Sequence, residues 1–177
     1  MYNNLRSLEP RTPFLETSPF PPHLVVPFVA ANKLHGETYG AELAANWQLT
    51  EWWRLRALYS YLHIQLHKEQ GSRDTISQAA VGNSPQNQFS LCSAMDLPWH
   101  LGPDLTLRYV DHLPNLHVGS YATLDVRLGW RPTQSLELAI VGQNLLEKHH
   151  SEFLPSFINT QPTEVQHSVY GKITWRC

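Results

Sequence analysis

The last third of the chain, Ser120 to Cys177, contains three segments in which apolar and polar residues alternate with a period of two. Successive side chains of a β-strand point to opposite faces, so this alternation predicts strands with one apolar and one polar face. In the second segment, Leu136 and Leu138 share one face and Glu137 lies on the other. Such strands fold into a sheet whose two faces meet different surroundings.

The same pattern extends through most of the chain. Pro27 removes a ladder donor, so the strand that contains it is expected to lie at an edge or to carry a bulge. Leu58 and Leu62 interrupt the alternation because both fall on the polar face. The sequence predicts about eight antiparallel strands. They are the stub Tyr2–Ser7, one long bulged strand Leu24–Leu49, and then Trp53–Leu66, Gln86–Leu97, Leu105–Asp111, Ala122–Trp130, Leu136–Gln143 and Val165–Arg176.

The connections between these strands alternate in length. Short connections are predicted at Thr50–Trp52, Pro98–Asp104 and Pro132–Gln134, and long ones at Leu8–His23, His67–Asn83 and Glu147–Glu164, with His112–Gly119 of middling length. Outer-membrane barrels show this asymmetry, with short periplasmic turns and long extracellular loops.

The aromatic residues provide an independent indication. All six tryptophans lie near the short connections, whereas five tyrosines lie nearer the long ones (Tyr39, Tyr59, Tyr61, Tyr109 and Tyr121). Tryptophan and tyrosine favour membrane interfaces because their rings are apolar and their N–H or O–H groups need water. The sequence therefore predicts an all-β, antiparallel, up-and-down transmembrane β-barrel fold.

Composition excludes several other classes. Charged residues make up 16% of the chain, below the usual share of about 25% for soluble domains. A formal net charge of -2 gives no basis for nucleic-acid binding. No run of about 18 apolar residues predicts a transmembrane helix. The N-terminus has no signal-peptide pattern, and Cys92 and Cys177 do not form a disulfide framework.

No enzyme, cofactor or metal site is predicted. The sequence contains no Gly-x-Ser-x-Gly elbow and no phosphate-binding glycine loop. His63 and His67 have helical metal-ligand spacing, but in a strand this spacing separates them by about 13 Å. Zinc needs its ligands much closer together.

Three stretches resemble TonB-dependent outer-membrane receptors. The first, a barrel segment, reads GETYGAELAANWQLTEWWRLRALYSYLH. The second resembles the strand pair near the family's C-terminus and reads SYATLDVRLGWRPTQSLELAIVGQNLLEKHHSEF, with a hallmark-like run at Gly142–Glu147. The third, YGKITWRC, resembles the terminal strand.

This resemblance implies a barrel of about 22 strands around an N-terminal plug domain. It also implies contact with outer-membrane lipid and the barrel-assembly machinery, and import of siderophores, cobalamin or similar nutrients driven by the TonB complex. The chain departs from the family because it has no plug or TonB box, has about eight strands and ends in Cys177 rather than an aromatic residue. Residues 1–177 therefore look like a single, incomplete C-terminal barrel domain that is not transport-competent alone.

Candidate ligand contacts lie in the last long loop. His149, His150 and Glu152 form a compact patch there, which is either solvated or in contact with a metal ion or the transported ligand. The charged residues of the polar face are expected to form a ladder of opposite charges, with plug contact as the other interpretation. They are Glu42, Arg54, Arg56, Asp96, Arg108, Asp125, Arg127, Glu137, Lys172 and Arg176.

Two other architectures remain open. Eight strands can close into a small autonomous outer-membrane barrel, whose narrow interior would then have to hold many charged side chains. A soluble β-domain would need the tryptophans to be buried.

Overall fold

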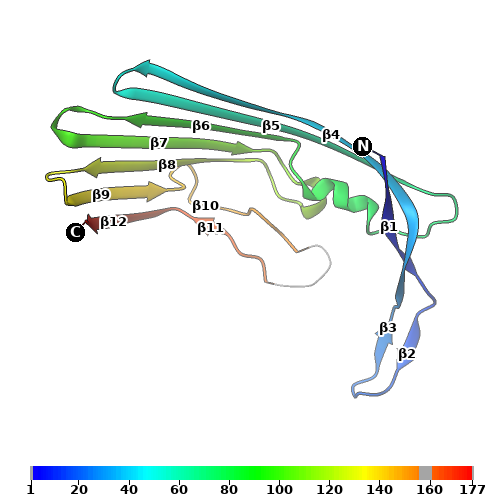
Figure 1. Ribbon diagram of the computed structural model, residues 1–177. Helices are drawn as coiled ribbons and strands as arrows, with labels where there is room; N and C mark the ends of the chain where they lie inside the picture. Colours follow the sequence, from blue (N-terminus) through cyan, green and yellow to red (C-terminus); the bar gives the residue numbers. More distant parts are fainter. Residues whose placement is uncertain (1, 156–160, 177) are drawn as a thin grey trace. The chain divides into compact units, whose positions relative to one another are not determined.

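The computed structural model describes residues 2–155 and 161–176, and Cys177 lies outside this range. An eight-stranded sheet runs in the order β1-β4-β5-β6-β7-β8-β9-β12 (Figure 1). Its order follows the sequence, so the sheet is an antiparallel meander, as the alternation predicted. The strands are Tyr2–Pro10 (β1), Phe28–Thr50 (β4), Trp53–Lys68 (β5), Asn87–Met95 (β6), Leu101–Val110 (β7), Tyr121–Trp130 (β8), Leu136–Gln143 (β9) and Ser168–Trp175 (β12).

Smaller elements occupy the connections. Phe14–Glu16 (β2) pairs with His23–Val25 (β3), and His149–His150 (β10) pairs with Val165–Gln166 (β11). Short 3-10 helices form at Gln78–Asn83 (η1), Pro98–His100 (η2) and Pro114–Leu116 (η3). The sequence predicted plain loops at Leu8–His23 and Glu147–Glu164. Pairings of two or three residues are too short for alternation to reveal them.

The predicted strand Leu24–Leu49 is wrong at its beginning. Leu24 belongs to β3, and β4 begins only after Pro27, whose carbonyl accepts the Arg11 N–H at 2.9 Å. The expected bulge is present, because the β1–β4 register shifts between Leu5 and Ser7. The extra residue opposite this shift lies in β4, away from the proline.

The described residues form two compact units. Unit 1 comprises Met1–Tyr39 and His63–Ser84, and unit 2 comprises Gly40–Leu62 and Pro85–Cys177. In unit 2, the cross-strand row Tyr59, Phe89 and Tyr109 belongs to one face of the sheet. The next row, which includes Ser90 and Arg108, belongs to the opposite face. These rows define an apolar and a polar face.

The apolar face is exposed. Leu43, Ile140 and Ile173 are 66%, 63% and 75% exposed, whereas soluble domains bury their large apolar stripes. A small buried cluster forms instead within the β7–β8 connection, where Leu113, Leu116 and Val118 pack together. No helix in the described ranges is long and apolar enough to cross a membrane.

The predicted alternation of connection lengths is confirmed. The short connections are residues 51–52, 96–100 and 131–135. The long connections, 11–27, 69–86, 111–120 and 144–167, all leave the opposite strand ends. An antiparallel meander places alternate connections at opposite ends, so one end of the sheet carries all the long segments.

Candidate functional site

The predicted patch in the last long connection is built on the β10–β11 pairing. His149 and His150 form β10, opposite Gln166 and Val165. The His149 Nδ1 lies 2.9 Å from the Glu164 Oε2, and both side chains are about half exposed. The pairing thus leaves His149 and Glu164 at the surface.

His150 has a different environment. Its side chain is only 5% exposed, and its ring stacks on Tyr121 with 4.4 Å between centroids. The Nε2 atom lies 3.3 Å from the Glu152 Oε1, while the buried Nδ1 atom has no hydrogen-bond partner among the described residues. His150 is therefore packed into the fold, unlike its neighbour.

Glu152 connects this histidine to the sheet. The Arg108 Nη2 of β7 donates to the Glu152 Oε1 at 3.2 Å, so this carboxylate lies between the arginine and the imidazole. We call Arg108, Tyr121, His150 and Glu152 the histidine cluster. It attaches the last long connection to the polar face of unit 2.

Sequence reasoning missed two members of this cluster. It assigned Tyr121 to an aromatic belt and Arg108 only to a charge ladder. Tyr121 pairs with Val110, and Arg108 pairs with Thr123 two residues further along both strands. Since pairs two residues apart share a face, Tyr121 and Arg108 lie on the same, polar face. The sequence positions of Arg108 and Tyr121 could have revealed this shared face only if the register between β7 and β8 had been known.

The other two histidines, His63 and His67, each contact another ring. His63 packs on Tyr39 with ring centroids 4.7 Å apart, and His67 stacks on His35 at 5.5 Å. Within the described ranges, no group of three His, Cys, Asp or Glu side chains could hold a metal ion.

The polar face of unit 2 carries the expected ladder of opposite charges. Arg54 pairs with Asp96 at 2.9 Å across the β5–β6 end. Arg127 of β8 pairs with Asp104 of β7 at 2.8 Å and with Glu137 of β9. One guanidinium thus joins three strands.

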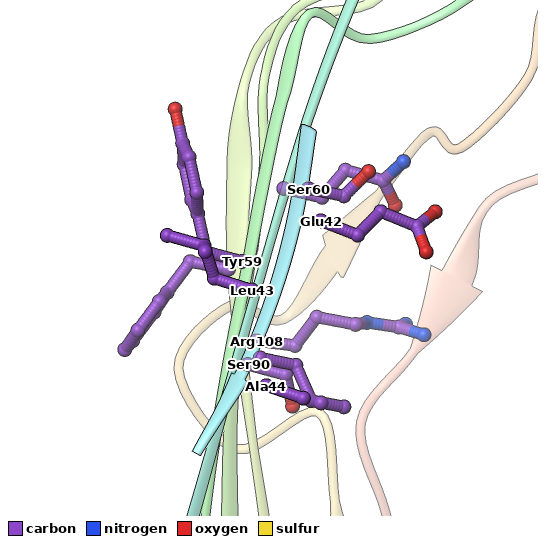
Figure 2. Close-up of a pocket in the computed structure, with 10 residues that line it drawn as sticks. Glu42, Leu43, Ala44, Tyr59, Ser60, Ser90 and Arg108 are labelled. Atoms are coloured by element: carbon purple, nitrogen blue, oxygen red, sulfur yellow. The ribbon is translucent and has the colours of Figure 1, made fainter. Parts of the chain in front are cut away.

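A hollow of about 510 Å³ on unit 2 offers no enclosed site. Figure 2 shows the residues around it on both sides of the strands. Leu43 and Tyr59 lie on one side, whereas Glu42, Ser60 and Arg108 lie on the other. The same view therefore displays the division between the apolar and the polar face.

Unit 1 contains a second polar network, which sequence reasoning did not identify. Asp74 is fully buried and accepts the backbone N–H groups of Leu8, Ile76 and Ser77 at 2.6, 2.8 and 2.9 Å. Burial raises the pKa of Asp74, but the hydrogen bonds from Ser77, Leu8 and Ile76 lower it by more, to about 2. The carboxylate therefore stays charged and fastens the 69–86 connection to β1.

Comparisons with known proteins agree with this architecture. Residues 4–145 match the family described as TonB dependent receptor-like, beta-barrel. The FpvAI–pyocin S2 complex contains a chain with a TM-score of 0.61 and 13% identity, covering 96% of this protein and 22% of that chain. The ferric yersiniabactin uptake receptor FyuA from Yersinia pestis has a TM-score of 0.55 and 22% identity, covering 82% of this protein and 24% of that chain. No curated protein matches the sequence.

These findings have two consequences. The identities are low, so the two structures show the shared fold alone, and the protein spans less than a quarter of either solved chain. The family match, in contrast, covers most of the sequence. Members of the family are outer-membrane transporters. The chain belongs to the TonB-dependent receptor β-barrel family.

Proposed function

We propose that this chain is a wall portion of an outer-membrane receptor that takes up a scarce nutrient, such as a siderophore or cobalamin. The observation that carries this proposal is the exposed apolar face of a meander whose long connections all leave one end. A bilayer covers such a face, and ligands arrive at the end with the long loops. FyuA, a ferric yersiniabactin uptake receptor, supports the metal-chelate class of substrate.

The partners follow from this role. Lipid contacts the apolar face, and the barrel-assembly machinery inserts the strands. In this role, residues 1–177 contribute to one barrel domain, which acts together with a plug domain and the TonB complex in transport. The outer membrane is the proposed location.

Within the last long connection, we propose that some residues contact the ligand and that one residue positions the loop. His149 and Glu164 are about half exposed and form the surface that a ligand meets first. Glu152, with its side chain 39% exposed, contacts the ligand from the inner side of the loop. His150 is buried against Tyr121, so it acts as a positioning residue that holds Glu152 and the loop in place.

The test is uptake by the full-length protein in a Gram-negative host that lacks its own receptors. Uptake of iron chelates and of cobalamin is measured in cells with and without TonB. The proposal predicts TonB-dependent accumulation of one of these nutrients and recovery of the protein in the outer membrane. TonB-independent accumulation, or recovery of the protein in the soluble fraction, would contradict it.

A further inference from the structure

A hollow of about 460 Å³ opens in unit 1, beside the connections 11–27 and 69–86. Its walls come from the end of β1, the beginning of β4 and the connection after β5. Three cationic side chains line it, those of Arg11, Lys33 and Arg73, together with the single carboxylate of Glu9. We call it the basic hollow. Three positive charges against one negative charge leave a net charge of +2.

The carboxylate does not neutralise these cations through close ion pairs. The Glu9 Oε1 accepts from the hydroxyls of Ser72 at 2.7 Å and Ser7 at 3.0 Å. The Glu9 Oε2 accepts the backbone N–H of Arg73 at 2.7 Å. Neutral donors thus occupy both oxygens of this carboxylate.

Across the described residues, none of the three cations lies within 4.0 Å of a carboxylate oxygen. Two arginines of the polar face in unit 2 differ. Arg54 and Arg127 lie 2.9 and 2.8 Å from an aspartate oxygen. Among the described residues, the basic hollow thus brings together three cations that lack an acidic partner at such a distance.

The wall that carries Arg73 is held in place. Asp74, the next residue, is anchored to the Leu8 N–H of β1, and the Arg73 N–H is bound by Glu9. On the other side of the hollow, the Lys33 Nζ lies 3.4 Å from the Gly71 carbonyl. Ligand binding therefore does not require this segment to be ordered first, which favours affinity.

The hollow lies away from the expected hydrocarbon region. Lys33 is six residues before Tyr39 in β4, which corresponds to about 20 Å along a strand. If Tyr39 marks the membrane interface, the hollow lies in the aqueous zone on the ligand side. Only this placement of the hollow in the aqueous zone rests on the proposed function.

We propose that the basic hollow binds a multiply charged oxyanion, a ligand that presents two or more carboxylate or phosphate groups. Guanidinium groups bind such groups through two parallel hydrogen bonds, and the lysine adds a point charge. Two sources share this chemistry, a soluble polycarboxylate or polyphosphate and the phosphate headgroup of a lipid.

The experiment titrates the full-length protein in detergent, by calorimetry at low ionic strength. The probes are citrate, pyrophosphate and the soluble short-chain lipid dihexanoyl phosphatidic acid. The double variant Arg11→Ala/Arg73→Ala is compared with the control Arg6→Ala, an exposed arginine of β1 that does not line the hollow. A second double variant, Arg11→Lys/Arg73→Lys, keeps the charge but loses the bidentate hydrogen bonding of the guanidinium groups.

The expected result is binding of at least one probe by the wild type and the control. The alanine variant loses at least tenfold in affinity, and the lysine variant falls between them. Tight binding of citrate or pyrophosphate identifies a soluble anion, and binding of phosphatidic acid alone identifies a lipid. Equal affinities of the wild type and the alanine variant, or no binding of any probe, would overturn the inference.

The uptake assay and the binding assay test the proposed function and the oxyanion site independently. Loss of TonB dependence in the uptake assay, with probe binding intact, removes the proposed function and leaves the oxyanion site. Absence of probe binding, with TonB-dependent uptake intact, removes the oxyanion site alone.

Discussion

Asn144 shows how one residue of the family-like run Gly142–Glu147 shapes the outer end of the sheet. Its φ of 55° lies in the left-handed region, which asparagine tolerates better than most residues. The Asn144 N–H donates to the Asp125 Oδ1 at 2.9 Å, and its Nδ2 donates to the Gln166 carbonyl at 3.2 Å. The residue thus ends β9 and connects it to β8 and β11.

Replacing this asparagine with alanine is expected to destabilise the protein. Asn144→Ala loses the side-chain hydrogen bond and keeps a strained backbone, which costs roughly 1–2 kcal/mol. Chemical unfolding of the detergent-folded protein measures the change in free energy. The neighbouring Gln143→Ala is the control, and an equal loss in both variants would contradict this role for Asn144.

The stability of unit 1 is expected to depend on pH because of Asp74. Its folded pKa of about 2 lies below its ordinary value of 3.8. The stabilisation is therefore fully present above about pH 4 and disappears as the pH falls towards 2, a change of about 2 kcal/mol. The protection of the Leu8, Ile76 and Ser77 amides against hydrogen exchange, measured relative to their intrinsic rates at each pH, should fall over this range in the wild type.

The Asp74→Asn variant separates this effect from general acid unfolding. Asparagine keeps an acceptor oxygen but loses the charge, so the same three amides are less protected at neutral pH and their protection varies less with acid. Thr75→Ala, at an exposed neighbour, should behave as the wild type. A pH profile that Asp74→Asn leaves unchanged would show that the carboxylate does not hold this connection.

At the scale of elements, Arg127 joins three strands through its two acidic partners. Removing it leaves Asp104 of β7 and Glu137 of β9 without their shared cation. Because both pairs are partly exposed, Arg127→Ala is expected to cost only about 1 kcal/mol. Arg56→Ala, also on the polar face, is the control for removing a charge, and unfolding in denaturant measures both variants.

Most strands of the sheet could be predicted from the sequence because they have their own alternation of apolar and polar residues. The polar face of β8, for example, is evident from Thr123, Asp125 and Arg127 without any knowledge of the neighbouring strands. The hairpin of β2 and β3 could not be predicted, since three pairings surrounded by prolines carry no periodic signal.

The candidate site was only partly predictable for a different reason. His149, His150 and Glu152 are close in sequence, so their proximity was evident. Their partners Arg108 and Tyr121 come from other strands and depend on the register. The basic hollow likewise combines β1, β4 and the β5–β6 connection, which no local pattern brings together.

At the scale of the molecule, the central question is which surface each face of the sheet meets. Leu43 and Ala44 are adjacent in β4, are both exposed, and point to opposite sides of the strand (Figure 2). Leu43 also lies midway between Tyr39 and Trp47 in the sequence, where the middle of the bilayer is expected. A pair of matched substitutions at these positions can therefore distinguish three architectures.

Leu43→Arg and Ala44→Arg should differ strongly if the chain is part of a wide outer-membrane barrel. An arginine on the lipid face near the bilayer midplane costs about 2–4 kcal/mol, whereas one facing a wide, wet lumen costs little. The folded fraction is measured in outer membranes by the heat-dependent gel mobility of the full-length protein. A small closed barrel has a packed interior, so both variants would then fail, and a soluble domain with a solvated surface would tolerate Leu43→Arg. Only loss of the folded band in Leu43→Arg, with Ala44→Arg unaffected, agrees with the wide barrel that the family relationship implies.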